Sequence, residues 1–149
     1  MELNDFIRPD RCIMLQNHRK NEALLELIEI IANQKAVRDV EELKKEIFYR
    51  EQLMSTGIGL SIAVPHVRFG GADTPIVVIG VQPEGVTDYE SLDEQTIKIV
   101  VMIVVAKDHH REYIRLLSII MSRLKDENVR EQLIAAKDSD TIASILRNQ

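Results

Sequence analysis

His66 follows Pro65 in a segment that also carries hydroxyl side chains and two glycines. The segment reads Ser55-Thr56-Gly57-Ile58-Gly59-Leu60-Ser61-Ile62-Ala63-Val64-Pro65-His66. An imidazole attacks a phosphorus atom through its unprotonated nitrogen, so the other nitrogen must donate its proton to a fixed acceptor. The phosphohistidine that results carries added negative charge, which oriented donors and cations stabilise. These residue types are therefore compatible with a phosphoryl group that is accepted and passed on by His66.

Three kinds of group near His66 in the sequence are able to bind a phosphoryl oxygen. Ser55 and Thr56 offer hydroxyls, and Gly57 and Gly59 offer backbone N–H groups. Arg50 or Arg68 offers a guanidinium charge. Glycine lets the backbone approach a phosphoryl group closely. Spacing alone leaves a second interpretation open, because a Gly-x-Gly turn is a weak signal. In that interpretation the glycines form a tight turn between a helix and a strand, and His66 is an ordinary loop histidine.

The elements that must position this segment follow from the hydrophobic pattern. Apolar residues at helical spacing predict one helix from Asn21 to about Ile31 and a second from Val40 toward Leu53, with a capping box at Asp39 and Glu42. Gly57 and Gly59 end the second helical pattern. A short strand at 62–64 follows, and Pro65 forces Val64 away from helical geometry. His66 is then expected at the edge of a sheet.

The second half of the chain predicts two long strands and then helices. The runs 76–81 and 97–105 are β-branched and apolar, which indicates strands covered on both faces, while 82–95 is expected to be a loop with one edge strand. A long helix should begin near His109 or His110, and Asn128 and Ser139 are expected N-caps of two short closing helices. The predicted fold is an α/β sandwich, a mixed sheet flanked by helices on both sides, in one domain spanning 1–149.

Composition restricts the partners. Lys plus Arg number 19 and Asp plus Glu 24, so the net charge is −5 and nucleic acid is not expected as a partner. One cysteine, Cys12, excludes an internal disulfide and a multi-cysteine metal site, and we expect no metal and no cofactor. The N-terminus lacks a secretory signal, and the apolar stretch 99–106 is shorter than the roughly 18 residues that span a bilayer. We therefore expect a cytoplasmic protein without direct membrane insertion.

The stretch from Arg50 to His66 resembles the signature of the enzyme IIA domains of the bacterial phosphoenolpyruvate-dependent phosphotransferase system. The branch is the fructose/mannitol type, which includes the nitrogen-regulatory IIA proteins. The matching residues are Arg50-Glu51, Ser55-Thr56-Gly57-Ile58-Gly59 and Ile62-Ala63-Val64-Pro65-His66. The resemblance extends over almost the whole chain, from the helix at 21–27 through Gly85-Val86 and Asp93 to the segment 116–126.

The resemblance implies a phosphotransferase component with a phosphohistidine intermediate. Its phosphoryl donor would be the small histidine-containing phosphocarrier protein, and its acceptor a IIB domain in sugar transport. His66 matches the phosphoacceptor, Arg50 the active-site arginine, and Thr56 the hydroxyl close to the phosphoryl group. An alternative is a stand-alone nitrogen-regulatory type of IIA protein, which acts by phosphorylation-dependent binding to regulatory partners. The 149 residues contain no IIB or membrane segment, which favours this alternative.

The sequence departs from the family pattern at the second active-site histidine. An ungapped alignment puts Tyr113 at that place, and Tyr113 is expected to donate a hydrogen bond to a phosphoryl oxygen. With an ordinary pKa of about 10, tyrosine does not share a titrating proton near neutrality. His109 or His110 is the alternative if the helix begins elsewhere. Met54 and Leu60-Ser61 also differ from the pattern and make the rim more apolar, and His18 is interpreted as a surface residue.

A third class, an independent hydrolase that uses Ser55 or Ser61 with His66, finds no support. The sequence around these serines lacks the Gly-x-Ser-x-Gly nucleophile elbow.

Overall fold

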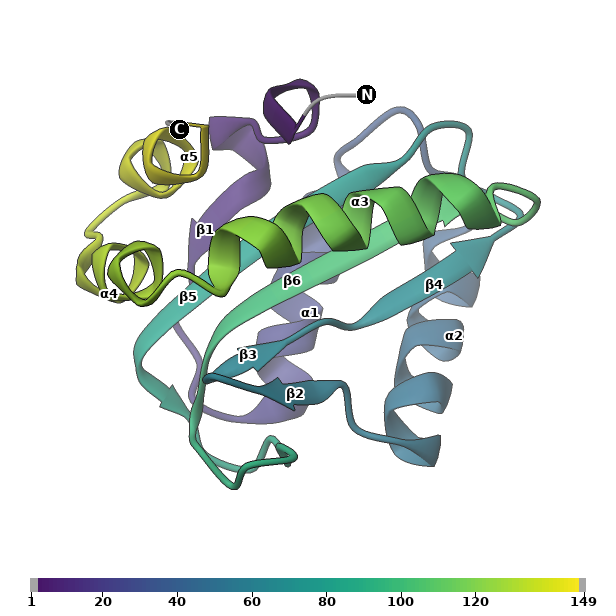
Figure 1. The fold of residues 1–149 in the computed structure, drawn as a ribbon. Helices are drawn as coiled ribbons and strands as arrows, with labels where there is room; N and C mark the ends of the chain where they lie inside the picture. The colour runs from purple at the N-terminus through teal and green to yellow at the C-terminus, as the bar shows by residue number, and fades with distance from the viewer. Residues whose placement is uncertain (1–2, 148–149) are drawn as a thin grey trace.

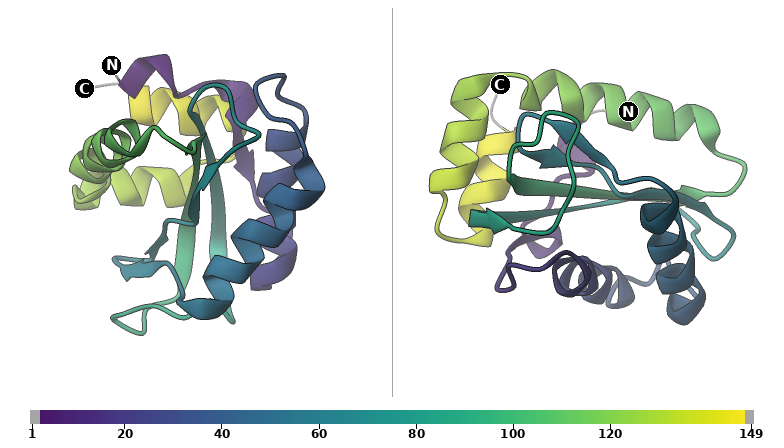
Figure 2. Two further views of the ribbon diagram at one scale, coloured as in Figure 1. Left: turned by 90° about the vertical axis from the view of Figure 1, so that its right-hand side faces the viewer. Right: turned by 90° about the horizontal axis from the view of Figure 1, so that it is seen from below.

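A six-stranded mixed sheet lies between two groups of helices in the computed structural model, which describes residues 3–147 (Figure 1). Viewed along the sheet, α1 and α2 cover one face and α3, α4 and α5 the other (Figure 2). The elements are the 3₁₀ turns Leu3–Asp5 and Pro9–Arg11, β1 Cys12–Met14, α1 Lys20–Ala32, α2 Val40–Leu53, β2 Gly57–Gly59, β3 Ile62–Ala63, β4 His66–Phe69, β5 Ile76–Val86, β6 Ile97–Ala106, α3 His110–Leu124, α4 Glu127–Ala135 and α5 Ser139–Arg147. This arrangement confirms the predicted α/β sandwich.

The antiparallel pair β5 and β6 forms the centre of the sheet. Its register pairs Ile76 with Val104 and Val81 with Ile99. The strand order is β1-β5-β6-β3-β2, with β1 parallel to β5 and β3 parallel to β6. Alternate side chains of β5 and β6 enter two separate hydrophobic clusters, one against α1 and α2 and one against α3 to α5. Both strands are thus covered on both faces, as their continuous apolar runs predict.

The edge of the sheet that carries His66 is built by two short strands in line. β3 pairs Ile62 with Ile99, and β4 pairs His66 with Ile103 of the same strand β6. Between them the Ile103 N–H donates to the carbonyl oxygen of Pro65 at 3.0 Å. Pro65 has no N–H to donate, so it fits an edge position. The buried backbone of this edge fixes where the His66 side chain begins.

The expected loop at 82–95 is shorter than predicted, because β5 continues through Val86. The sheet register shifts between Val81 and Val86, where Val86 pairs with Ile97. Gln82 is buried there, and its amide nitrogen donates to the carbonyl oxygens of Leu15 at 2.8 Å and Asn17 at 3.2 Å. A polar residue such as Gln82, next to Pro83 and Gly85, predicts a loop. Its hydrogen bonds to a distant segment instead make it part of the strand.

The helix boundaries agree with the sequence, but the expected capping residues do not. Asp39 has φ 57° and makes no capping hydrogen bond, so the predicted capping box at Asp39 and Glu42 is wrong. An N-cap needs an extended backbone, which the left-handed conformation of Asp39 excludes. Asp126 caps α4 by accepting from the Asn128 N–H at 2.8 Å, and Asp138 precedes α5 and accepts from the Thr141 N–H at 2.8 Å. Asn128 and Ser139 are therefore not the caps.

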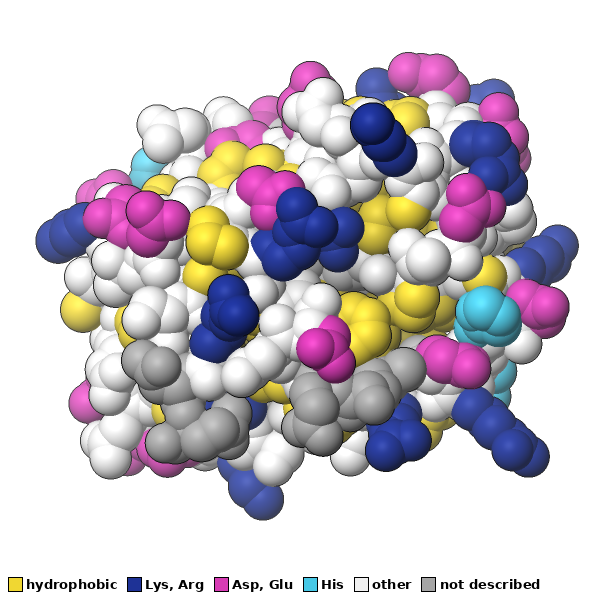
Figure 3. Space-filling model, turned by 90° about the horizontal axis from the view of Figure 1, so that it is seen from above, with side chains coloured by type: hydrophobic (Ala, Val, Ile, Leu, Met, Phe, Trp, Pro, Cys, Tyr) yellow, Lys and Arg dark blue, Asp and Glu magenta, His cyan; other side chains and the backbone are white. Residues whose placement is uncertain are grey.

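The helices range from 9 to 15 residues, and α3 is the longest. Among residues 3–147, no helix combines the length and apolar character required to cross a membrane. Seen from above the view of Figure 1, the surface carries charged side chains of both signs, with smaller patches of hydrophobic side chains between them (Figure 3).

Candidate functional site

His66 is half-buried at the first position of β4, and one of its ring nitrogens is fixed by the backbone. Its Nδ1 lies 2.8 Å from the carbonyl oxygen of Val64. A carbonyl oxygen only accepts hydrogen bonds, so Nδ1 carries the proton and donates it. In the neutral ring Nε2 is then unprotonated and retains its lone pair. The turn at Val64-Pro65 thus sets both the orientation and the tautomer of the imidazole.

Tyr113 lies against His66. It is in the first turn of α3, and its ring stacks on the imidazole with centroids 4.9 Å apart and an interplanar angle of 19°. Burial raises the pKa of the Tyr113 hydroxyl, and the positive charge of Arg50 acts in the opposite direction. The phenol therefore stays neutral near pH 7 and is a hydrogen-bond donor. Of the residues considered for this position, Tyr113 is the one that stacks on His66, while the His110 ring lies 6.3 Å from Tyr113 and His109 precedes the helix.

A cavity of about 260 Å³ opens in front of His66. It brings together the end of α2, the following loop and the start of β4. Its lining residues are Arg50, Leu53, Met54, Ser55, Thr56 and His66. Leu53 and Met54 are 67% and 77% exposed, so an apolar rim surrounds the predicted site residues. Three of the residues that the sequence singled out, Arg50, Ser55 and Thr56, thus share one cavity with His66.

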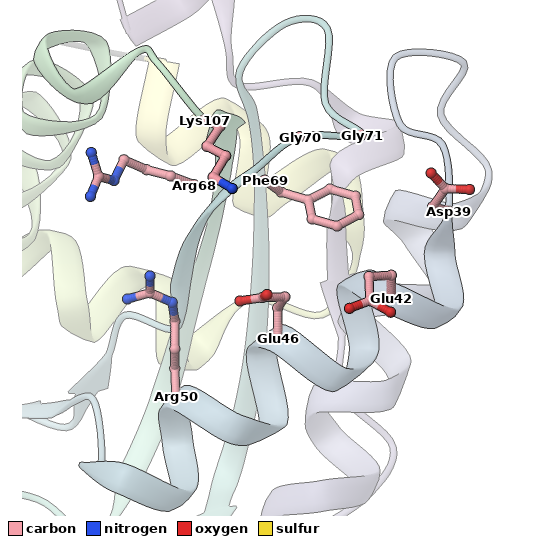
Figure 4. Close-up of a pocket in the computed structure, with 9 residues that line it drawn as sticks. All are labelled: Asp39, Glu42, Glu46, Arg50, Arg68, Phe69, Gly70, Gly71 and Lys107. Atoms are coloured by element: carbon pink, nitrogen blue, oxygen red, sulfur yellow. The ribbon is translucent and has the colours of Figure 1, made fainter.

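Arg50 also borders a second, larger groove of about 530 Å³ (Figure 4). Arg50, Arg68 and Lys107 extend into one end of this groove, and Asp39 and Glu42 lie at the other. Within residues 3–147 the guanidinium of Arg50 forms no ion pair. Its planar array of donors is consequently available to an anion in either cavity.

A buried carboxylate that sequence reasoning missed lies behind Thr56. Glu51 is 6% exposed and accepts hydrogen bonds from both the hydroxyl and the N–H of Thr56, the latter at 3.2 Å. Lys20 Nζ lies 3.1 Å from the same carboxylate, and the Tyr89 hydroxyl is 2.9 Å from Thr56 Oγ1. One signal was available in the sequence, because Leu43, Ile47 and Glu51 recur every four residues on one helix face. A charged residue on that buried face requires a partner.

The glycines and Ser55 form a second set of contacts that shapes the loop. Ser55 Oγ donates to the carbonyl oxygen of Glu90 at 2.6 Å and accepts from the Gly57 N–H at 3.3 Å. The Gly59 N–H donates to Ser91 Oγ at 3.1 Å. Gly57 must be glycine for a steric reason, since a Cβ there would lie 2.0 Å from the Glu90 carbonyl oxygen. Both glycine amides thus have partners, Gly57 within the loop and Gly59 at Ser91 in the neighbouring segment.

The residue types of the site indicate which kind of ion it suits. Across residues 3–147, no group of three or more His, Cys, Asp or Glu side chains is arranged to hold a metal ion. The cavity in front of His66 is lined by the guanidinium of Arg50 and the hydroxyls of Ser55 and Thr56, which are groups suited to an anionic oxygen. An imidazole whose Nε2 carries the lone pair is chemically able to attack an electrophilic phosphorus.

Comparison with known proteins gives matches over nearly all of the chain. A family model described as phosphoenolpyruvate-dependent sugar phosphotransferase system, EIIA 2, matches residues 6–149. The chain is 31% identical over 132 residues to the fructose-specific EIIABC component of Bacillus subtilis, covering 89% of this chain and 21% of that protein. It is 27% identical to the fructose-specific EIIA component of Haloferax volcanii, covering 85% of this chain and 82% of that protein. With the nitrogen regulatory protein of Pseudomonas aeruginosa the identity is 24%, covering 98% and 95%.

Solved structures share the fold. The nitrogen regulatory protein IIA-Ntr of Neisseria meningitidis superposes with a TM-score of 0.86 at 19% identity, over 97% of this chain and 98% of that one. The mannitol IIA protein of Escherichia coli gives a TM-score of 0.77 at 26% identity, over 93% and 97%. A complex of this mannitol IIA with phosphorylated mannitol IIB matches with the same TM-score of 0.77 at 25% identity, over 94% and 96%.

Proposed function

The chain belongs to the phosphoenolpyruvate-dependent sugar phosphotransferase system EIIA 2 family, and from this membership we propose that it carries a phosphoryl group on Nε2 of His66. One observation supports the choice of atom above all others. The Nδ1–H of His66 donates to the Val64 carbonyl oxygen at 2.8 Å, so the lone pair of the neutral ring is on Nε2. We further propose that residues 1–149 form a single IIA-type domain that acts in the cytoplasm.

The proposed step is an exchange between two imidazoles. Nε2 of His66 attacks the phosphorus of a phosphohistidine on the donor protein, and a new N–P bond forms. The N–P bond of the donor breaks, and its electron pair returns to the donor imidazole. The Nδ1–H of His66 stays on the Val64 carbonyl oxygen throughout and stabilises the ring as positive charge develops on it. The reverse sequence passes the phosphoryl group on.

The other site residues take roles that follow from their contacts. Arg50 faces the cavity without an ion pair in residues 3–147, and we assign it to the phosphoryl oxygens. Tyr113 holds the imidazole plane by stacking and offers a neutral hydroxyl in place of the usual second histidine. Thr56 lines the same cavity and is the proposed hydroxyl donor. The sequence predicts that Ser55, Gly57 and Gly59 bind the phosphoryl group directly. We propose instead that they shape the loop, because their polar groups are bonded to one another and to the segment at Glu90 and Ser91.

The proposed phosphoryl donor is the small histidine-containing phosphocarrier protein, and the proposed acceptor is a IIB domain. The mannitol relative is seen in a complex with phosphorylated IIB, which supports the second proposal. Leu53 and Met54 offer an apolar rim around the cavity on which such a partner docks.

A second candidate function is regulation, in which the phosphorylation state of His66 controls binding to a regulatory protein. The observation that favours it is the extent of the alignment with a regulatory relative. The alignment with the nitrogen regulatory protein of Pseudomonas aeruginosa covers 98% of this chain and 95% of that protein. Against exclusive regulation, fructose-specific relatives also match. Transfer of the phosphoryl group to an isolated fructose- or mannitol-type IIB domain separates the two candidates, because a purely regulatory protein would not phosphorylate it.

The test of the proposed function is labelling from radioactive phosphoenolpyruvate in the presence of enzyme I and the phosphocarrier protein. We expect an acid-labile adduct on the wild type and none on His66→Ala. His18→Ala is the matched control, because His18 interacts with Gly85 and Glu84 away from the cavity, and it should be labelled as the wild type is. An unlabelled wild type under conditions that label a known IIA protein would contradict the proposal.

A further inference from the structure

Thr56 has one hydroxyl proton, and in this structure that proton is already used. In the short contact between the two side chains, the Thr56 hydroxyl donates and a carboxylate oxygen of Glu51 accepts. The remaining close partner of Thr56 Oγ1 is the Tyr89 hydroxyl at 2.9 Å. Since the Thr56 proton points to Glu51, Tyr89 must be the donor in this second bond. The hydroxyl that faces the cavity of His66 therefore has no proton to offer a phosphoryl oxygen.

The network around Glu51 contains a substitute donor. Tyr89 is 4% exposed, and burial followed by the charge of Glu51 raises its pKa, so its hydroxyl remains protonated. The Tyr89 hydroxyl lies 2.9 Å from Thr56 Oγ1, which itself contacts the Glu51 carboxylate, so the three groups are immediate neighbours. Lys20 contributes further, because its Nζ lies 3.1 Å from the carboxylate and 4.4 Å from the centroid of the Tyr89 ring. The Glu51 carboxylate can thus accept a hydrogen bond from whichever of the two hydroxyls is available.

We infer that Tyr89 is a positioning residue that exchanges hydrogen-bond donors with Thr56 when His66 is phosphorylated. In the unphosphorylated state Thr56 donates to Glu51 and Tyr89 donates to Thr56. In the phosphorylated state Tyr89 donates to Glu51, and Thr56 turns its proton to a phosphoryl oxygen. Each proton stays on its own oxygen, and Glu51 loses no hydrogen bond. The inference rests on the proposed phosphoacceptor role of His66 and adds how the site supplies a donor only when it is needed.

The exchange links the site to two distant parts of the chain. Lys20 begins α1 and Tyr89 lies in the loop after β5, whereas Glu51 and Thr56 are at the end of α2 and just beyond it. A buried carboxylate oxygen that loses a hydrogen bond raises the free energy of the site even with Lys20 nearby, so without another donor Thr56 would be held on Glu51 when a phosphoryl group arrives. Tyr89 removes this conflict, because it replaces the donor that Thr56 withdraws.

The measurement is the equilibrium of phosphoryl exchange between the phosphocarrier protein and this chain. Without the donor exchange, Thr56 cannot form its hydrogen bond to a phosphoryl oxygen. A hydrogen bond to a charged acceptor is stronger than one to a neutral acceptor, so this loss should shift the phosphoryl group about tenfold toward the phosphocarrier protein at equilibrium. Tyr89→Phe removes only the hydroxyl and should show this shift. Tyr49→Phe, at a residue that is 60% exposed, is the matched control and should not.

A double-mutant cycle with Thr56→Val separates the exchange from a merely structural effect. If Tyr89 acts through Thr56, each single variant shifts the equilibrium about tenfold and the double variant shifts it no further. All variants are compared below their melting midpoints, so lowered stability does not obscure the result. An unchanged equilibrium for Tyr89→Phe on a wild type that is labelled at His66, or shifts that multiply to roughly a hundredfold, would overturn the exchange alone. An unlabelled wild type would overturn both the exchange and the phosphoacceptor assignment.

Discussion

Replacing Gly57 by alanine should deform the loop that supports the site. A Cβ at this position would lie 2.0 Å from the carbonyl oxygen of Glu90 and 2.9 Å from Cα of Ser91. Both are backbone atoms, so the clash cannot be relieved by turning a side chain. The segment around Glu90 has to move away. Its hydrogen bonds to the site loop include Ser55 Oγ to the Glu90 carbonyl oxygen at 2.6 Å and the Leu92 N–H to the Gly57 carbonyl oxygen at 3.1 Å.

The expected cost follows from these contacts. Overpacking of this kind costs about 1–3 kcal/mol. Each weakened hydrogen bond adds about 1 kcal/mol at most. We therefore expect the free energy of unfolding to fall by about 3 kcal/mol, which corresponds to a melting midpoint lowered by about 10 °C for a domain of this size.

The assay is urea and thermal unfolding of Gly57→Ala beside Gly70→Ala. Gly70 has no atom within 4 Å of an added Cβ, and its substitution should change the free energy of unfolding by less than about 1 kcal/mol. The labelling of His66 from the phosphocarrier protein should also fall in Gly57→Ala, because Ser55 and Thr56 are displaced with the loop. A Gly57→Ala protein that melts within about 2 °C of the wild type would refute the reasoning from close backbone approach.

Three further predictions concern the neighbours of His66 and the loop. Tyr113→His should accelerate phosphoryl transfer in quench-flow experiments, because an imidazole titrates near neutrality whereas burial raises the pKa of the phenol. Arg50→Lys should slow transfer about tenfold, since one ammonium cannot replace a planar array of donors, and Arg147→Lys on α5 should have no effect. Asp93→Ala should lower the melting midpoint at pH 7, because hydrogen bonds from the Leu60 and Gln95 N–H groups lower the pKa of Asp93 in the folded protein.

The outcomes that would contradict these predictions are equally specific. A Tyr113→His protein that transfers no faster would show that the tyrosine does not limit exchange. Equal rates for the Arg50→Lys and wild-type proteins would remove Arg50 from the phosphoryl site. For Asp93 the sign of the pH dependence matters. Its pKa is lower in the folded protein than in the unfolded chain, so its carboxylate stabilises the fold above the ordinary pKa of about 3.9. This contribution disappears as the pH falls through the pKa of the folded protein. A difference from Asp93→Ala that does not shrink as the pH falls below that range would contradict the assignment.

Local sequence patterns predicted the segments in which buried apolar residues follow one another along the strand or recur along one helix face. The apolar runs at 76–81 and 97–105 and the helix that begins at His110 are such segments. The pattern failed at 82–86, where Gln82 is buried only because its amide reaches the carbonyl oxygens of Leu15 and Asn17. The caps of α4 and α5 were missed for a different, local reason, since Asp126 and Asp138 stand one or two residues before the residues that the helix pattern favours and accept the hydrogen bonds instead.

The candidate site was predictable only where its residues lie close in the sequence. Arg50, Thr56 and His66 fall within one motif, and the structure places all three around one cavity. Glu51 belongs to the same motif, but its role depends on Lys20 and Tyr89, which are separated from it by about thirty residues or more in opposite directions along the chain. No local pattern shows which of these distant groups meets Glu51.

The ring nitrogen of His66 that is proposed to carry the phosphoryl group is the central claim of this account, and it follows from the hydrogen bond at Nδ1. Nitrogen-15 NMR of the phosphorylated protein distinguishes the two ring nitrogens directly. With Nδ1–H held by the Val64 carbonyl oxygen at 2.8 Å, the spectrum should show phosphorus bonded to Nε2 of His66 and a proton on Nδ1. A phosphoryl group on Nδ1 of His66, or on any residue other than His66, would contradict this account.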